Sequence, residues 1–72
     1  PKYVFALDGK GTALVKSGRY KEAIIVLDKA LTINPKNVLG LYDKGTSLVK
    51  SGRYEEAIIV LDKALTIIQR MF

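Results

Sequence analysis

The chain has 72 residues and a formal net charge of +5, and it contains neither cysteine nor histidine. Disulfide bonds are therefore impossible, and zinc or soft-metal sites, which depend on these side chains, are not expected. Hydrophobic residues make up 49% of the chain and charged residues 26%, which is typical of a folded domain. Because so short a chain buries only about 60% of its unfolded surface, we expect close helix packing or self-association to stabilise it.

Apolar residues at helical spacing predict a first helix over about residues 4–16. Ser17-Gly18 follows it, and glycine suits the left-handed conformation that closes many helices. A second helix is predicted over about residues 20–33, with Tyr20 wedged into the crossing of the two helices. Asn34-Pro35 ends this helix, because proline disfavours a helical residue before it. The buried stripe of the second helix is expected to consist of Ala23, Ile24, Leu27, Ala30 and Leu31.

The second half of the chain repeats the first at an offset of 34 residues. Of the 34 pairs from 1/35 to 34/68, 26 are identical. Periods of about 20–50 residues are typical of stacked units that are each too small to bury their own apolar face. We expect one domain over residues 1–72, with repeat 1 at about 1–34, repeat 2 at about 35–68 and a helical extension at 69–72.

The second unit is predicted to fold as the first does, with Tyr54 in the place of Tyr20. Its expected buried stripe is Ala57, Ile58, Leu61, Ala64 and Leu65. No stop signal follows this stripe, so the last helix is expected to run on towards Phe72. A glycine in the middle of a helix costs about 1 kcal/mol relative to alanine. Its recurrence at Gly11 and Gly45 therefore indicates a neighbouring helix too close for a side chain.

These positions carry a resemblance to a known family. The helix–turn–helix unit with Gly11, Gly18, Tyr20, Ala23, Leu27, Ala30 and Pro35, matched by Gly45, Gly52, Tyr54, Ala57, Leu61 and Ala64, resembles the tetratricopeptide repeat (TPR). The resemblance implies an all-α fold in which helices A1, B1, A2 and B2 form an antiparallel stack, a short α-solenoid. It also implies a protein-interaction scaffold in which the A helices line a peptide-binding groove.

The groove positions of the family correspond to one face of each A helix, and their spacing independently puts them on one side. Lys16 and Lys50 are predicted to hold a carboxylate or an acidic side chain, and Thr12 and Thr46 to bond a peptide backbone. The partner is thus expected to be a protein or peptide, acidic or with a free carboxylate. The family's chaperone-tail clamp has Lys and Asn where this chain has Asp8 and Thr12, so that ligand is not expected. The ten positions are Phe5, Asp8, Thr12, Val15 and Lys16, then Leu39, Tyr42, Thr46, Val49 and Lys50.

A second apolar surface is predicted on the B helices. Ile25 lies about 160° from Leu27 around the helix, among polar side chains, and Ile59 repeats this placement. No polar capping helix follows the second repeat, so the last helix pair is expected to show an uncovered apolar flank. We expect a homo-oligomer, by end-to-end stacking, a two-fold dimer or exchange of a helix pair. The alternative is that this apolar surface packs against the next repeat of a longer parent array. The predicted self-association residues are Ile25, Val26, Ile59, Val60, Ile68, Met71 and Phe72.

Other classes of function are less favoured. Without cysteine and histidine there is no nucleophile–base pair for an enzyme, and no cofactor is expected. Residues 8–12 lack the phosphate-loop pattern. Lysines along the A helices, beside Tyr42, could hold a single nucleic-acid strand, but acidic residues are interleaved with them. The longest apolar run, residues 23–27, is far too short to span a membrane, and we expect a cytoplasmic protein.

A second functional hypothesis is a structural or engineered repeat whose main interaction is with itself. Pro1-Lys2 repeats the register of Pro35-Lys36, so the chain begins as though cut from a linker between repeats. This favours either a fragment of a longer array or an engineered repeat.

Overall fold

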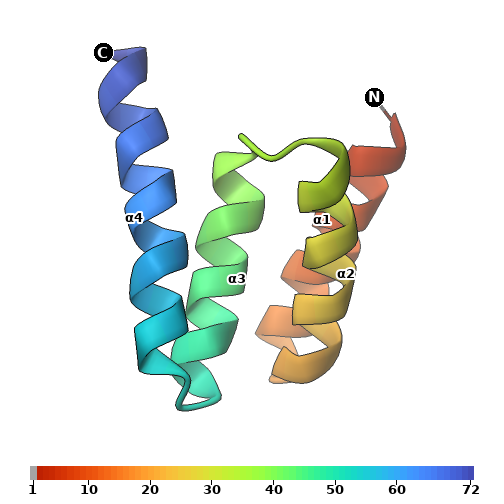
Figure 1. The fold of residues 1–72 in the computed structure, drawn as a ribbon. Helices are drawn as coiled ribbons and strands as arrows, with labels where there is room; N and C mark the ends of the chain where they lie inside the picture. Colours follow the sequence, from red (N-terminus) through yellow and green to blue (C-terminus); the bar gives the residue numbers. More distant parts are fainter. Residues whose placement is uncertain (1) are drawn as a thin grey trace.

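Four α-helices make up the computed structural model, which describes residues 2–72 (Figure 1). They are α1 (Lys2–Lys16), α2 (Tyr20–Ile33), α3 (Val38–Lys50) and α4 (Tyr54–Met71), and no strand occurs within residues 2–72. Helices α1 and α2 form one helix–turn–helix pair and α3 and α4 the other, and α2 packs against α3 to join them. The predicted all-α stack of two units is confirmed. The inference drawn from Pro1 lies outside the described residues.

The turn within each pair has the same geometry. Gly18 and Gly52 have positive φ angles of 75° and 77°, in the left-handed region that glycine adopts without strain. The N–H of Gly18 donates to the carbonyl of Val15, and the N–H of Arg19 to that of Leu14. This is the Schellman arrangement, and it satisfies carbonyls that a helix end would otherwise leave unbonded.

The two helices of each pair approach closely at a glycine. A Cβ atom built on Gly11 would lie 2.4 Å from Leu27 Cδ2, and one on Gly45 would lie 2.4 Å from Leu61 Cδ2. Real Cβ atoms do not approach other carbon atoms so closely. The prediction that these glycines accommodate a neighbouring helix is confirmed.

The repeats share their cores unequally. The first core contains residues of α1 and α2 only, including Leu7, Leu14 and Leu27. The second core contains Leu41 and Leu48 of α3, and it also takes Ile24 from α2, with Leu31 packed against it. The first repeat therefore completes the core of the second, which makes the two repeats one packed unit.

Three side chains predicted to be buried in repeat 2 are exposed instead. Tyr54 is 61% exposed, Ile58 58% and Leu65 54%, whereas Ile24 in repeat 1 is only 7% exposed. The prediction was wrong because burial at these positions comes from the following helix pair. Helix α3 covers this side of α2, but no helix among residues 2–72 covers the same side of α4, which lies at the edge of the stack (Figure 1).

Candidate peptide-binding surface

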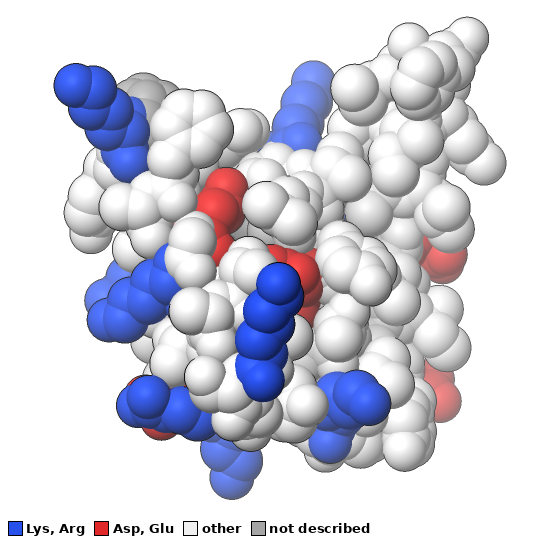
Figure 2. All heavy atoms as spheres, turned by 180° about the vertical axis from the view of Figure 1, so that it is seen from behind, with Lys and Arg blue, Asp and Glu red and all other residues white. Residues whose placement is uncertain are grey.

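Helices α1 and α3 present the ten predicted groove positions, and four of these positions expose large apolar side chains. Phe5 is 75% exposed, Tyr42 57%, Leu39 50% and Val49 40%. Seen from behind, the molecule has acidic atoms towards the middle of the face and basic side chains to the left of them and below (Figure 2). This face therefore combines apolar contact area with charges of both signs.

The two predicted carboxylate-binding lysines lie at the same end of the face. Lys16 and Lys50 are exposed and occupy the last turns of α1 and α3. Cations are favoured there, because the helix dipole places partial negative charge at the C-terminus. Within residues 2–72 neither lysine forms an ion pair, so both ammonium groups are accessible to a ligand. Val15, Thr12 and Thr46 are half-buried beside them.

Asp8 is not the exposed groove residue that the sequence predicted. It is only 8% exposed, and both of its carboxylate oxygens accept hydrogen bonds from Asn37 Nδ2, at 2.7 and 2.8 Å. Asn37 is the N-cap of α3, where its side-chain oxygen also accepts from the Gly40 N–H. Asp8 is buried because repeat 2 stacks on repeat 1 and brings Asn37 over this carboxylate, which lies 29 residues earlier in the chain.

A second bond between the repeats involves Thr12 and Asp43. Thr12 Oγ1 donates to Asp43 Oδ2 at 2.7 Å, and Asp43 is only 5% exposed. The Thr12 hydroxyl hydrogen is thus already committed, and only its lone pairs remain for a peptide. Two carboxylates, Asp8 and Asp43, therefore lie at the α1–α3 junction without a cationic partner within residues 2–72.

Sequence reasoning missed Asn37 and Asp43, although the mismatches between the repeats could have revealed them. Six of the eight mismatched pairs fall between α1 and α3, at positions 3, 5, 6, 8, 9 and 13 of repeat 1. In repeat 2, four of these positions are buried or half-buried: Asn37, which caps α3, and Gly40, Asp43 and Ser47 on α3. Their counterparts in repeat 1, which are Tyr3, Ala6, Gly9 and Ala13, are all exposed. The copies thus differ where one copy contacts a neighbouring repeat and the other does not.

The predicted self-association residues divide into two groups. Val26 and Val60 are both 8% exposed and belong to the two cores, so they are too buried to form a surface for self-association. The helical periodicity alone places both valines at the edge of the buried stripe of their helix. In the structure, α1 packs over Val26 and α3 packs over Val60. The exposed members are Ile25 (60%), Ile59 (58%), Ile68 (37%), Met71 (67%) and Phe72 (98%). The last turn of α4 also carries one basic residue, Arg70, which is exposed.

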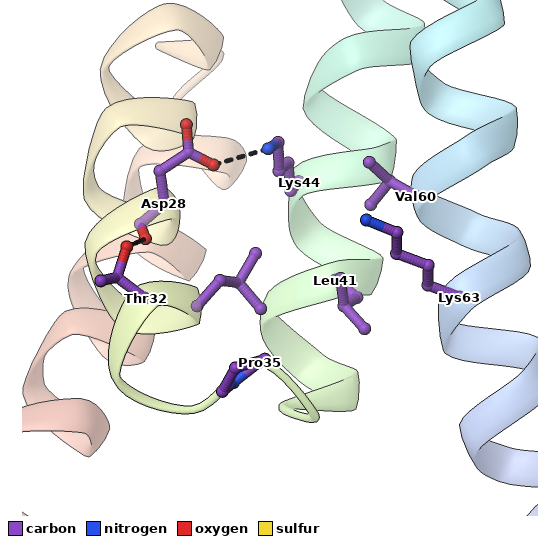
Figure 3. Close-up of a pocket in the computed structure, with 8 residues that line it drawn as sticks. Asp28, Thr32, Pro35, Leu41, Lys44, Val60 and Lys63 are labelled. Atoms are coloured by element: carbon purple, nitrogen blue, oxygen red, sulfur yellow. Dashed lines mark hydrogen bonds and ion pairs between the residues drawn. The ribbon is translucent and has the colours of Figure 1, made fainter.

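A separate pocket is lined by residues of α2, α3 and α4 (Figure 3). Lys44 Nζ lies 2.6 Å from Asp28 Oδ1 and joins α3 to α2 across this pocket. Leu41 and Val60 contribute apolar surface, and Lys63 extends from α4 towards the same space. The ion pair is half-exposed, so its main effect is to fix the register of the two helices rather than to supply much stability.

The other two ion pairs lie at the starts of the B helices. Arg19 Nε and Nη2 donate to the two oxygens of Glu22 at 2.9 and 2.7 Å, and Arg53 bonds Glu56 in the same way. Hydrogen bonding from the arginine holds the pKa of each glutamate below its usual value. Neither helix start has a side-chain cap, so these acidic groups also balance the positive end of the helix dipole.

Comparison with known families agrees with this architecture. Residues 14–70 match the tetratricopeptide repeat family, and the chain belongs to that family. Its repeats are typically non-catalytic modules for protein–protein interaction. A search of curated proteins found no match to the sequence. None of the helices in residues 2–72 has the length and apolar character needed to cross a bilayer.

Proposed function

We propose that this chain is a scaffold that binds an extended peptide segment on the α1–α3 face. The observation that carries the proposal is the exposure of Phe5, Leu39, Tyr42 and Val49 on that one face. Large exposed apolar patches with polar rims are typical of interaction sites.

The charges on the face suggest how such a peptide is oriented. Lys16 and Lys50 provide two free ammonium groups at the C-terminal ends of α1 and α3, which suit a free carboxylate or an acidic side chain. Asp8 and Asp43 are nearly buried and already bonded to Asn37 and Thr12, so they influence a peptide only through their negative charge, which disfavours an acidic group beside them. The Thr46 hydroxyl is available to a peptide backbone, whereas that of Thr12 already donates to Asp43.

Selection from a random-peptide library displayed with free C-termini tests this proposal, followed by affinity measurement on the best binder. Lys50→Glu should weaken binding about tenfold or more, and amidation of the peptide C-terminus should weaken it similarly. Lys21→Glu is the matched control, because it makes the same charge change on α2, where repeat 2 naturally carries Glu55. Equal affinities for the Lys50→Glu and Lys21→Glu variants would refute the predicted role of the lysine pair.

We also propose that the chain self-associates, because several large apolar side chains on α2 and α4 are exposed. They include Ile25, Ile59, Ile68, Met71 and Phe72. If Ile25 and Ile59 form the contact, replacing both with glutamate abolishes association, while Lys50→Glu leaves it intact. Sedimentation equilibrium of these two variants separates this surface from the peptide-binding face.

Two smaller predictions belong to the same proposal. Residues 1–72 act as one domain, with repeats at 1–34 and 35–68 and an extension of α4 at 69–72. The protein works in the cytoplasm, which cell fractionation with an antibody against the chain can test.

A further inference from the structure

The junction between α2 and α3 buries two side chains whose counterparts on α4 are exposed. Ile24 is 7% exposed in the second core, and Leu31 packs against the same core. Ile58 and Leu65, one repeat later, are 58% and 54% exposed. The chain thus carries the same apolar projections twice and covers them only once.

The surface that receives these projections is also present twice. On α3, Leu41 and Leu48 belong to the core that Ile24 enters, and on α1 their counterparts are Leu7 and Leu14. The outward face of α1 beside these leucines carries two short apolar side chains, Ala6 and Ala13, both exposed, together with Lys10 and Tyr3. A free end of the molecule therefore resembles the surface that already accepts α2 inside the chain.

On α3 the receiving surface includes Gly40, which lies close to Leu31, and its counterpart on α1 is Ala6. A Cβ atom built on Gly40 would lie 3.4 Å from Leu31 Cδ2, which is ordinary van der Waals contact. It would be tighter against the side chain of Asn37, at 3.0 Å from Nδ2, but position 3 of repeat 1 holds tyrosine instead. Ala6 is thus compatible with a leucine packed as Leu31 is packed.

Charge complementarity follows the same register. The internal junction is crossed by the ion pair between Asp28 and Lys44. The counterparts are Asp62 on α4 and Lys10 on α1, both exposed. A second copy placed on α4 as α3 lies on α2 would bring its Lys10 to Asp62.

One polar pair at the internal junction is replaced by an aromatic pair at the two ends of the molecule. Inside the chain, Asp8 is bonded by Asn37. At the free ends both members of this pair are replaced together, Asp8 by Tyr42 and Asn37 by Tyr3. Both tyrosines are largely exposed, at 57% and 64%. An aromatic pair in place of a polar pair is compatible with contact between the ends.

We propose that copies of this chain associate head to tail, with α1 of one copy seated on α3 and α4 of the next. The inference rests on the self-association proposed above, but it places the contact at Ile58 and Leu65 rather than at Ile25 and Ile59. Ile58 and Leu65 enter the core beside Leu7 and Leu14 of the next copy. Asp62 pairs with Lys10 there.

This contact uses two different surfaces and leaves a free one at each end, so it continues into an open stack. It also extends the α1–α3 face, because Tyr42 of one copy comes to lie beside Tyr3 of the next. The isoleucines at 25 and 59 stay outside this contact. Ile25 is 60% exposed even though the internal junction covers α2.

Two variants blocked at opposite ends test the arrangement by sedimentation equilibrium. The first variant carries Ile58→Glu and Leu65→Glu on α4, and the second carries Ala6→Glu and Lys10→Glu on α1. All four positions are exposed, so both variants should keep the fold. Circular dichroism verifies this. We expect each variant alone to remain near 8.0 kDa. An equal mixture should form a dimer of about twice that mass, because each variant retains the end that the other lacks.

Other outcomes overturn the proposal and are distinguishable. If the variant changed on α1 dimerises alone, the contact is a two-fold pairing of α4. If both variants associate alone, the contact lies elsewhere, as in the Ile25/Ile59 surface or in exchange of a helix pair. If the unaltered chain is monomeric at every concentration, self-association itself is refuted.

A charge exchange gives a second readout that does not depend on deleting apolar contacts. Asp62→Lys should weaken association at least about tenfold, and adding Lys10→Asp to the same chain should restore most of the affinity. The control is the double variant Asp62→Lys with Lys63→Asp. It has the same net charge as the unaltered chain, but its negative charge lies one position further along α4. Failure of the Lys10→Asp change to restore association would contradict the assigned register.

Discussion

Asn37 Nδ2 donates to both carboxylate oxygens of Asp8, at 2.7 and 2.8 Å, and so ties the start of α3 to the middle of α1. The same Asn37 side chain caps α3 by accepting from the Gly40 N–H. One residue therefore starts the second repeat and fixes it on the first. It also removes Asp8 from the surface that a peptide would contact.

Asn37→Ala should destabilise the protein by about 1–3 kcal/mol, because it removes a helix cap and leaves the buried Asp8 carboxylate without its donor. Asn34→Ala is the matched control. Asn34 is exposed, and its side chain accepts only a 3.2 Å bond from the Lys36 N–H, so its loss should cost about 0.5 kcal/mol. Urea unfolding of both variants makes the comparison, and equal costs would show that the bond to Asp8 adds nothing.

The glycine at the helix crossing can be tested in both repeats. Gly11→Ala and Gly45→Ala each gain about 1 kcal/mol of helix propensity and each force a leucine to move. Leu27 is fully buried, whereas Leu61 is only half-buried and has more room to shift. Gly11→Ala should therefore be the more destabilising of the two, by about 1–2 kcal/mol relative to Gly45→Ala. Thermal unfolding ranks the two variants, and a larger cost at Gly45 would contradict this packing argument.

The core shared by the two repeats gives a third prediction, because Ile24 and Ile58 occupy equivalent positions in the two repeats. Ile24→Ala should cost about 2–5 kcal/mol, because Ile24 is buried in the core of repeat 2. Ile58→Ala should cost less than about 1 kcal/mol when measured on dilute protein, because Ile58 is exposed there. Denaturation at low micromolar concentration measures both. A similar cost for the two would mean that α4 is covered even in the monomer.

The arginine–glutamate pairs predict a pH dependence. Hydrogen bonding from Arg19 lowers the pKa of Glu22 from the ordinary value of 4.5. Its contribution to stability is present above that ordinary value and is lost as pH falls through the lower pKa of the folded state. Because the pair is exposed, the contribution is small and salt weakens it further.

Arg19→Gln should therefore move the pKa of Glu22 upward, and NMR titration of the side-chain carboxyl measures this directly. Arg53→Gln should do the same to Glu56 and leave Glu22 unchanged, so each variant is a control for the other. An unchanged Glu22 pKa in the Arg19→Gln variant would show that the hydrogen bond in the structure is not formed in solution.

Much of the fold could be predicted from the sequence because its signals are local. Helical spacing, Gly18 and Gly52, and the proline after α2 determine the helices and turns without reference to distant residues. The role of Gly11 could also be predicted, since the same costly residue recurs at one register.

The remaining features depend on contacts between repeats, which one helix pattern does not contain. Asp8 has the spacing of a groove residue, and only the arrival of Asn37 from the next repeat buries it. Ile58 has the same spacing as Ile24, but its burial requires a following helix pair. Val26 lies on the flank of its own helix stripe, and α1 buries it.

Sedimentation equilibrium of the unaltered chain over a wide concentration range tests the central claim most directly. The claim is that the surface joining the two repeats is also exposed at the ends of the molecule and joins one copy to another. The average mass should then rise continuously from 8.0 kDa, pass twice that value and continue to increase with concentration. A mass that stays at 8.0 kDa at all concentrations, or that levels off at a dimer, would contradict it.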